Sequence, residues 1–256
     1  MPVLAVDTEF LREKTYYPKL CLVQVSTGEE IAAIDPLSID DLSPLVRLFE
    51  DQKIVKVIHA CSQDLEVLLY GMHCACAPVF DTQLAAAFLG MRQQASYASV
   101  VEHYMGVHLP KTESLTDWSR RPLDPEQLVY AEDDVRYLPD IYRCMYERLM
   151  KTNRLGWLMP EMNAYTAPEN FKRDPKEAYL HLKRSNSLTR RQMALAREIC
   201  AWREERAAQH NIPRKWIISD ETLVEICKRA PATSERLKRI RGTESLSQES
   251  VASIFA

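Results

Sequence analysis

The chain has 256 residues, of which 46% are hydrophobic, so it is long enough for one large domain and a smaller one. It contains no run of about 18 apolar residues and does not begin with a basic stretch followed by an apolar one, so no membrane span or secretory signal is predicted. Its seven cysteines are scattered and odd in number, which is typical of reduced thiols and predicts a cytoplasmic protein.

The net charge of −3 conceals an asymmetry between two parts of the chain. Residues 1–160 hold 15 Lys and Arg against 23 Asp and Glu, whereas residues 161–256 hold 18 against 13. A basic C-terminal part can neutralise the phosphates of a polyanion. An excess of this size is also typical of helices whose charged faces are merely solvated, so charge alone leaves both interpretations open.

The first predicted element is a buried strand over residues 3–9, which begins with an apolar run. Because side chains alternate between the two faces of a strand, Asp7 and Glu9 are expected to point the same way. Val6 and Thr8 are expected to point to the opposite face. Two like charges on one face of a strand are unfavourable unless a cation binds between them. The alternative is that the strand ends at Val6 and an acidic loop follows.

The next elements predict a sheet with helices packed on it. Strands are expected over residues 20–26, 31–35 and 54–59, and helices over residues 41–50 and 63–70. Ser62 is expected to cap the second helix and Gly71 to end it. Asp64 would then lie in the first helical turn, where acids are common because of the helix dipole alone.

Two further helices are predicted between residues 81 and 105. Asp81 precedes an apolar stretch that reaches Leu89 and is expected to be an N-cap rather than part of a site. The second helix covers residues 95–105. Its apolar face is expected to comprise Tyr97, Val100, Val101 and Tyr104.

The helix that begins at Pro125 carries the most specific pattern. Asp124 is the expected N-cap and Pro125 the first helical residue. Tyr130 and Asp134 are four residues apart and therefore neighbours on one face. Asp133 points about 100° away and is expected to be solvated.

The rest of the chain is expected to be helical. The long helix would run toward Met150, with Pro139 bending or breaking it. Residues 156–186 contain three prolines and no strong periodicity, so they predict a linker and docking segment. Thr189 and Gln192 then form a capping-box pattern.

The C-terminal helices are expected to enclose a small core. The helix after Thr189 is expected to bury Leu195, Ile199 and Trp202, and Trp216 is also expected in the core because large aromatic residues dominate small cores. Short helices are predicted at 220–229, 234–241 and 247–255, with Gly242 as a stop.

The acids Asp7, Glu9, Asp64 and Asp134, which lie on the first strand and on two of the predicted helices, suggest one metal site. Carboxylates that converge in a fold repel one another and require a cation. Hard oxygen ligands select Mg²⁺ or Mn²⁺ over Zn²⁺. A carboxylate cluster with few His or Cys ligands is typical of a two-metal site that cleaves phosphodiesters.

These motifs together resemble a known family. The chain resembles the DEDDy 3′→5′ exonucleases in three motifs: Asp-x-Glu on the first strand, an Asp after a His-Ala strand end, and Tyr-x-x-x-Asp on a late helix. The longer sequence stretches around these motifs resemble the bacterial ribonuclease D family. The stretches that carry the resemblance are residues 6–10, 15–18, 34–37, 64–67, 80–83, 116–118 and 130–138. Residues 195–202, 212–216 and 237–242 resemble the helicase-and-RNase-D C-terminal (HRDC) domain.

The resemblance implies an α/β fold of the ribonuclease-H-like type followed by a small all-α bundle. The implied division is an exonuclease domain over residues 1–155, a linker and docking segment over 156–186 and an HRDC domain over 187–256. The implied activity is metal-dependent hydrolysis of the terminal phosphodiester at the 3′ end of RNA, with release of nucleoside 5′-monophosphates.

The resemblance also implies a role for each acid. Asp7, Glu9 and Asp134 would ligate the first of two Mg²⁺ or Mn²⁺ ions. Asp7 would bridge to the second ion, which Asp64 would hold directly or through water. Tyr130 would orient the attacking water, since a tyrosine with an ordinary pKa near 10 is a poor general base.

Contacts with the terminal nucleotides are predicted at four other residues, for each of which packing or solubility is an equally good explanation. These residues are Thr8, Phe10, His59 and Lys111. The implied partners are the 3′ ends of transfer-RNA precursors and other small structured RNAs. No membrane, no nucleotide cofactor and a monomeric state are expected.

Other functions are also compatible with parts of the pattern. A DNA exonuclease of the proofreading or helicase-associated kind would use the same metals, because only a contact to the ribose 2′-hydroxyl separates the two polymers. A non-catalytic nucleic-acid-binding protein on the same fold is disfavoured by the five intact site residues. A Walker-type ATPase is disfavoured because the chain has only six glycines and no Gly-x-x-x-x-Gly-Lys.

Two departures from the family pattern are expected to matter. Met1 is only six residues before Asp7, whereas the family has a short segment before the first strand, so either translation starts upstream or the sheet lacks a covering element. Some members carry a second HRDC domain. Its absence is expected to weaken or redirect substrate capture without abolishing the chemistry.

Overall fold

The computed structural model describes residues 1–110, 116–244 and 246–255. Within it the chain forms two compact units. The first unit comprises residues 1–11 and 18–171, and the second comprises residues 12–17 and 172–256. Among the described residues, no helix has both the length and the apolar character needed to cross a membrane.

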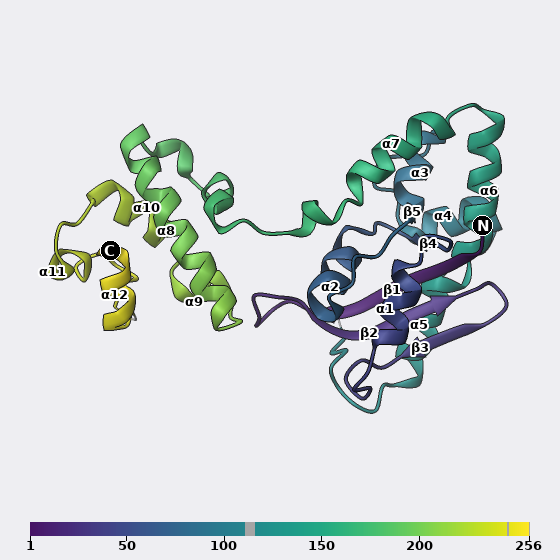
Figure 1. The fold of residues 1–256 in the computed structure, drawn as a ribbon, viewed down its shortest axis with the longest axis horizontal. Helices are drawn as coiled ribbons and strands as arrows, with labels where there is room; N and C mark the ends of the chain where they lie inside the picture. The colour runs from purple at the N-terminus through teal and green to yellow at the C-terminus, as the bar shows by residue number, and fades with distance from the viewer. Residues whose placement is uncertain (111–115, 245, 256) are drawn as a thin grey trace. The chain divides into compact units, whose positions relative to one another are not determined.

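The first unit is built on a five-stranded mixed sheet with the order β3-β2-β1-β4-β5 (Figure 1). β1 pairs with β2, and β2 with β3, in antiparallel register, whereas β1–β4 and β4–β5 are parallel. The strands are β1 (Val3–Leu11), β2 (Lys19–Ser26), β3 (Ile31–Ile34), β4 (Val55–Ile58) and β5 (Val79–Asp81). The predicted strands are confirmed. β5 was not expected, because three residues directly before a helix carry no alternating pattern of their own.

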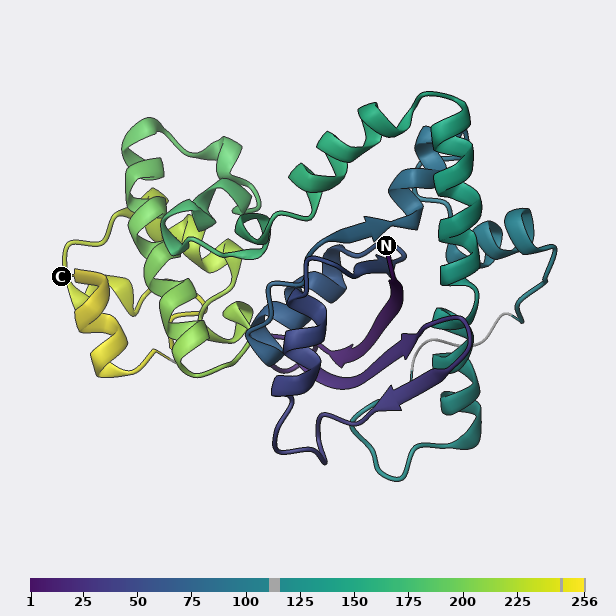
Figure 2. The ribbon, with the colours of Figure 1, turned by 45° about the vertical axis from the view of Figure 1, so that its right-hand side comes forward.

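Helices cover both faces of this sheet (Figure 2). Alternation along β1 sends Ala5 into a core cluster with residues of α3 to α7, while Leu4 and Val6 enter a second cluster with α1 and α2. The helices are α1 (Ser43–Glu50), α2 (Ser62–Met72), α3 (Thr82–Phe88), α4 (Tyr97–Met105), α5 (Pro125–Arg136), α6 (Leu138–Lys151) and α7 (Leu155–Tyr165), followed by the 3-10 helix η1 (Pro168–Phe171). The predicted mixed sheet flanked by helices is therefore confirmed.

The ends of α2 differ from the prediction. The helix includes Ser62, and the residue at its N-cap, Cys61, makes no capping side-chain bond. It also continues through Gly71 to Met72 and ends where His73 adopts a left-handed conformation. Gly71 is needed for another reason: a Cβ there would lie 3.1 Å from Cβ of Leu20. The glycine lets the helix approach β2 closely and does not stop it.

The predicted break in the long helix is confirmed. α5 ends at Arg136 and α6 begins at Leu138, with Pro139 in the first turn of α6. The segment 156–186, expected to be a linker, contains most of α7 and three 3-10 helices. The prolines of this segment interrupt the periodic pattern from which a helix is predicted, and Pro160 lies inside α7.

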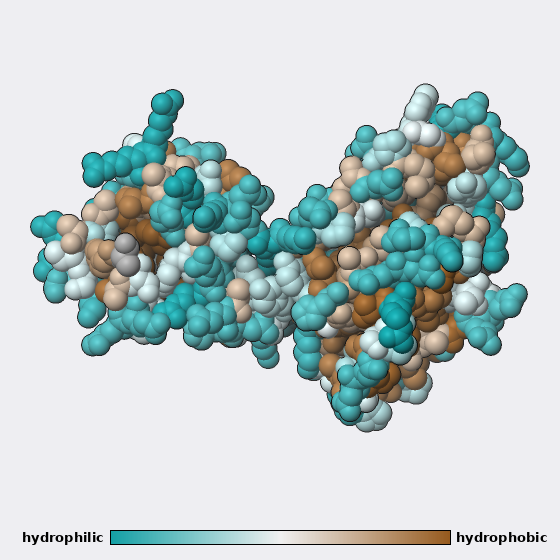
Figure 3. Space-filling view, viewed as in Figure 1, coloured by the Kyte–Doolittle hydropathy of each residue, from teal (hydrophilic) through white to brown (hydrophobic). Residues whose placement is uncertain are grey.

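The second unit is a bundle of short helices around α8. Its elements are η2 (Pro175–His181), η3 (Ser185–Ser187), α8 (Arg190–Gln209), α9 (Arg214–Ile217), α10 (Asp220–Arg229), α11 (Ser234–Leu237) and α12 (Gln248–Phe255). The capping box of Thr189 and Gln192 is present as predicted. Hydrophilic residues cover much of the face of this unit that is visible in Figure 3.

Four aliphatic and aromatic residues of this bundle were predicted in the core, and one of them, Ile199, is buried there as expected. Trp202 packs against the core cluster, as expected. Leu195 is 37% exposed and Trp216 is 54% exposed, so these two predictions were wrong. Helical spacing identifies a face but cannot say how far a small bundle extends over it.

Residues 12–17 are an integral part of the second unit. The hydroxyl of Tyr16 donates to Oε2 of Glu204 at 2.8 Å, and Glu204 is only 4% exposed. Oδ1 of Asn211 accepts hydrogen bonds from the backbone N–H groups of Tyr16 and Tyr17, both at 3.1 Å. The guanidinium of Arg173 lies 4.9 Å from the centroid of the Tyr16 ring.

Candidate active site

Strand β1 brings two acids to one side of the sheet. β1 continues through Leu11, so the alternative of an acidic loop after Val6 was wrong. Asp7 and Glu9 each offer a carboxylate oxygen to a group with Asp134 in which all three oxygens lie within 4.8 Å of one another. This arrangement confirms the prediction that Asp7 and Glu9 point the same way.

Helix α5 supplies the third acid of the group. The helix is fixed at its start by a capping box in which the backbone N–H of Asp124 donates to Oε1 of Gln127 at 2.9 Å. Tyr130 lies one turn before Asp134 on the same helix, and its ring centroid is 6.0 Å from that of Trp118. α5 packs on β1, β2 and β3, so its residues face the strand that carries the other acids.

Asp133 does not join this group. Its Oδ1 forms an ion pair with Nε of Arg136 at 3.0 Å. The adjacent acid on α5 is therefore directed to a partner on its own helix.

Asp64 reaches the site from the opposite face of the sheet. It lies in the first turn of α2 and is 7% exposed. Oγ1 of Thr8 donates to Oδ1 of Asp64 at 2.6 Å, and Thr8 itself is 5% exposed. Thr8 points away from its neighbours Asp7 and Glu9, as alternation requires, and thereby meets the helix on the other side.

Burial and nearby charges raise the pKa values of all four acids. Burial raises the pKa of Asp7 well above its usual range, and the charges of Asp64, Asp134 and Glu9 add to the effect. Burial raises the pKa of Glu9 to about 8, with contributions from Asp134 and Asp64. The pKa values of Asp64 and Asp134 are raised to about 7, again chiefly by burial. Asp64 is therefore electrostatically part of the cluster although it lies outside the three-oxygen group.

Tyr130 is held in its neutral form. Burial, followed by the charge of Asp134, raises the pKa of its hydroxyl far above the ordinary value of 10. A protonated phenol beside Asp134 can donate and accept a hydrogen bond, but it cannot act as a base near neutral pH.

The predicted capping role of Asp81 is confirmed, and its contacts extend beyond the cap. Its carboxylate accepts from the backbone N–H of Gln83 at 2.7 Å and of Leu84 at 3.1 Å. It also accepts from the N–H of Ala60 at 3.3 Å and of Cys61 at 2.8 Å. The sequence signal for a cap did not reveal that the same carboxylate fixes the turn leading into α2 and thus the position of Asp64.

Gln24 is another residue beside the acidic group that was not predicted from the sequence. It is paired with Asp7 across the β1–β2 ladder and is 1% exposed. Neither its amide nitrogen nor its amide oxygen has a hydrogen-bond partner among the described residues. A polar residue inside the apolar run Leu22–Val25 was the available signal.

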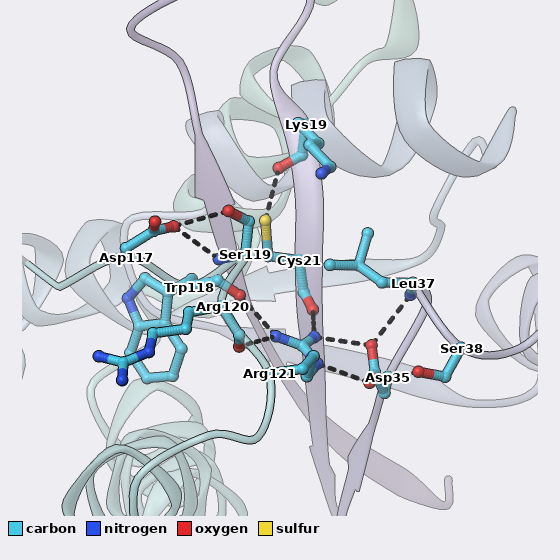
Figure 4. A network of polar contacts seen from close by, with 10 residues as sticks. All are labelled: Lys19, Cys21, Asp35, Leu37, Ser38, Asp117, Trp118, Ser119, Arg120 and Arg121. Atoms are coloured by element: carbon cyan, nitrogen blue, oxygen red, sulfur yellow. Dashed lines mark hydrogen bonds and ion pairs between the residues drawn. The ribbon is translucent and has the colours of Figure 1, made fainter.

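Arg121 fixes the loop that leads to α5 (Figure 4). Its guanidinium makes two hydrogen bonds to the carboxylate of Asp35, both at 2.7 Å, and one to the carbonyl oxygen of Cys21 at 2.8 Å. It also donates to the carbonyl of Trp118 at 2.8 Å. The network joins this loop to β2 and to the end of β3. The bonds to Arg121 hold the pKa of Asp35 well below its usual range.

Three of the four residues predicted to contact nucleotides are described by the structure, and they lie in different surroundings. Thr8 is bonded to Asp64, as described above. Phe10 packs against the cluster that contains α1 and α2. The ring nitrogens of His59 lie 2.9 Å from Oγ1 of Thr82 and 3.1 Å from the carbonyl of Ala95, so a substrate bond to either would replace an internal one. Lys111 lies outside the described residues.

A cavity of about 590 Å³ adjoins the acidic group. Tyr130 and Asp134 contribute to its wall, together with residues at the start of α4 and in the first turns of α5. Its volume is typical of sites for small ligands. The apolar part of the wall includes Tyr97, Leu109 and Val129.

Comparisons with known proteins indicate the family to which the chain belongs. A family described as 3′-5′ exonuclease matches residues 1–150, and the HRDC domain matches residues 192–252. The ribonuclease D of Sphingobium indicum is 44% identical over 246 residues, which cover 94% of this chain and 62% of that protein. The chain thus spans about three fifths of the length of the curated relatives it matches.

Two solved structures show the same fold. The structure of Escherichia coli RNase D, an exoribonuclease involved in structured RNA processing, matches with a TM-score of 0.87 and 33% identity, covering 100% of this chain and 68% of that one. Brucella melitensis NrnC with bound Mg²⁺ matches with a TM-score of 0.58 and 26% identity, covering 66% of this chain and 84% of that one.

The chain therefore belongs to the 3′-5′ exonuclease family. The predicted resemblance to bacterial ribonuclease D and its HRDC domain is confirmed.

Proposed function

We propose that this protein is a metal-dependent 3′→5′ exoribonuclease that hydrolyses the terminal phosphodiester of RNA. The observation that carries the proposal is the convergence of Asp7, Glu9 and Asp134 within 4.8 Å, one helical turn from Tyr130. The similarity to E. coli RNase D and to the curated ribonucleases D supports RNA as the substrate.

The donor set fits divalent cations of the hard type. Asp7, Glu9 and Asp134 offer only carboxylate oxygens, which suit Mg²⁺ or Mn²⁺. Burial, together with the charges of the neighbouring acids, raises the pKa values of Asp7 and Glu9, so their ionised forms are destabilised and a bound cation would stabilise them. We assign one ion to these three residues and a second to Asp7 and Asp64. Such ions supply a hydroxide nucleophile near neutral pH and stabilise charge on the leaving oxygen.

The protein side chains would position the reactants. The neutral hydroxyl of Tyr130 would hydrogen-bond the attacking water and hold it in line with the terminal phosphate. The cavity bordered by Tyr130 and Asp134 would receive the 3′-terminal nucleotide, with Val129 and Tyr97 excluding water from part of its wall. The product would be a nucleoside 5′-monophosphate. Transfer-RNA precursors and small structured RNAs in the cytoplasm are the proposed substrates.

The proposal is tested with a single-stranded RNA that is labelled at its 5′ end and carries a free 3′ hydroxyl. The purified protein is incubated with this RNA, and separately with DNA of the same sequence, in Mg²⁺, Mn²⁺ or EDTA. A metal-dependent ladder shortened from the 3′ end of RNA is expected. A ladder on DNA alone would show that the protein is a DNA exonuclease and not a ribonuclease. The absence of any ladder would contradict the proposed nuclease activity.

A variant separates catalysis from binding. Asp7→Asn should lower the rate by more than about a hundredfold. Substitution of a residue that only supports a metal ligand already costs up to about a hundredfold, and Asp7 is proposed as a ligand itself. It should still bind RNA, because the substitution removes metal-binding charge and leaves the cavity intact. Turnover at the wild-type rate would remove Asp7 from the mechanism.

A further inference from the structure

A single arginine ties the loop that leads to α5 to the sheet (Figure 4). The guanidinium of Arg121 makes five hydrogen bonds, as many as it has N–H donors. Two of these bonds go to the carboxylate of Asp35. The other three go to backbone carbonyls at 2.8 Å, those of Cys21, Trp118 and Arg120. Because two of the carbonyls belong to the loop and one to β2, the side chain fixes the course of its own loop against the sheet.

Arg121 suits this position by its shape as well as by its charge. Its Nε and Nη2 atoms donate to the two carboxylate oxygens of Asp35 at 2.7 Å each, which is the planar fork that a guanidinium offers. The side chain of Arg121 is only 26% exposed. A lysine would keep the charge, but its ammonium group has too few donors for the carboxylate and the carbonyls together.

The loop presents the ring of Trp118 to α5. Trp118 is 3% exposed and belongs to a small cluster that also contains Leu22 of β2 and Ala131 of α5. Tyr130 packs against this cluster, and its ring plane makes an angle of 39° with that of Trp118 at a centroid distance of 6.0 Å. Aromatic pairs at such a separation have preferred geometries, so the indole restricts the directions that the phenol can take.

The direction of the Tyr130 ring decides where its hydroxyl lies. Tyr130 lines the cavity beside Asp134, whereas Arg121 and Trp118 are not among the described residues that line it. A helical tyrosine can adopt more than one common χ1 rotamer, and a misplacement of about an ångström can cost about a hundredfold in rate. A contact that selects one rotamer can therefore affect the rate without touching the substrate.

We propose that Arg121 is a positioning residue for the reaction and that it acts through Trp118 on the hydroxyl of Tyr130. The inference rests on the proposed function, in which this hydroxyl orients the attacking water. Arg121 holds the loop, the loop holds the indole, and the indole holds the phenol in the orientation that the reaction requires. Loss of the guanidinium lowers kcat and leaves the cavity and the metal-binding acids in place.

The test is a double-mutant cycle in the full chain. Arg121→Lys, Tyr130→Phe and the combination of both are compared with the wild type for kcat and KM on a short single-stranded RNA. Mg²⁺ affinity is measured by calorimetry without RNA. The control is Arg143→Lys, which changes the arginine of an exposed ion pair with Asp140 on α6. Thermal melting verifies that every variant is folded at the assay temperature.

Arg121→Lys should lower kcat about tenfold, which is less than the loss of a full ångström of alignment can cost, and should change KM and Mg²⁺ affinity by less than about twofold. In the Tyr130→Phe background the same substitution should change kcat by less than about twofold, because the hydroxyl that it positions is absent. The control should match the wild type. An unchanged kcat in Arg121→Lys, a loss of the same size in both backgrounds, or a fall in Mg²⁺ affinity would overturn the inference.

The intermediate link has its own variant. Trp118→Leu removes the ring beside Tyr130 and should lower kcat in the wild-type background but not in Tyr130→Phe. A loss that persists in Tyr130→Phe would show that Trp118 supports α5 as a whole and would overturn the path through the indole. The proposed function fails if the wild-type chain does not trim RNA in Mg²⁺. The inference fails separately if the wild-type chain trims RNA and the losses from Arg121→Lys and Tyr130→Phe are independent of each other.

Discussion

Oγ1 of Thr8 donates a hydrogen bond of 2.6 Å to Oδ1 of Asp64, and both side chains are buried. Thr8 lies between two acids of the site in the sequence, yet it points to the other face of the sheet. There it meets the one acid of the cluster that comes from α2. The hydrogen bond lowers the pKa of Asp64 against the larger effect of burial, so Thr8 favours the ionised carboxylate.

Thr8→Val should therefore lower activity near neutral pH. Valine has nearly the same shape but no donor, so the pKa of Asp64 should rise further and a smaller fraction should be ionised. A rise of about one pKa unit would lower the ionised fraction, and with it the rate, by about fivefold at pH 7 and about tenfold at lower pH. The pH–rate profile should shift toward higher pH. Thr8→Ser, which keeps the hydroxyl, is the control, and coincident profiles for Thr8→Val and the wild type would contradict the role.

Tyr130→Phe should reduce the rate by about 10- to 100-fold, which is less than the loss of a proton-transferring group costs, because Tyr130 only orients the attacking water. The ring keeps its packing next to Trp118, and no metal ligand is removed. Metal affinity, measured by calorimetry, should therefore change little. An unchanged rate would limit Tyr130 to packing, whereas a large loss of metal affinity would show that it supports the ligands.

Added Mg²⁺ should raise the melting temperature more at about pH 8 than at about pH 6, because the ligands must lose protons to bind it. The pKa values of Glu9, Asp64 and Asp134 are about 8, 7 and 7, all above their unfolded values near 4. Raised carboxylate pKa values mean that the metal-free protein loses stability as pH rises through this interval. Metal should offset the loss. Differential scanning fluorimetry with Mg²⁺ or EDTA measures both trends, and an equal effect of Mg²⁺ at both pH values would contradict the assignment of these acids as ligands.

The ion pair of Arg121 and Asp35 should make stability sensitive to acid. Because the folded pKa of Asp35 is depressed, its contribution is present above the unfolded value near 4 and is lost as pH falls below it. Asp35→Asn should lower the free energy of unfolding by about 1–2 kcal/mol at neutral pH, allowing for partial exposure of the pair. The difference from the wild type should shrink in acid. Urea unfolding across a pH series measures it.

The control for this experiment is Asp40→Asn. Asp40 is an exposed acid close by in the sequence, and no ion pair to it is found in the described part of the chain. If both variants lost the same stability, general surface charge would explain the effect and the specific pair would not.

The sequence predicted those features of the site that depend on local rules. Alternation along a strand placed Asp7 and Glu9 on one side, and helical spacing with a clear cap placed Tyr130 beside Asp134. The roles of Gln24 and Arg121 were not predictable in this way. Gln24 matters because of what lies across the ladder, and Arg121 because of carbonyls and an acid up to 100 residues away. Such contacts depend on the tertiary fold and leave no periodic signal in the chain.

The outcome was similar for secondary structure. Long elements with caps were predicted well, whereas β5 and α7 were missed because one is very short and the other contains Pro160. Trp216 was placed in the core by residue type alone, and the structure exposes more than half of it. Residue type and period identify which elements form but not how completely each is covered.

The membership of residues 12–17 in the second unit bears on how this protein can evolve. A C-terminal domain exchanged by recombination would bring new residues opposite Tyr16, whose partners Glu204 and Asn211 lie almost 200 positions later. The exchanged domain would leave a phenol and two backbone N–H groups without their acceptors unless the loop changed with it. Positions 16, 204 and 211 should therefore vary together among related sequences, and the helical domain should be inherited with this loop rather than as an independent cassette.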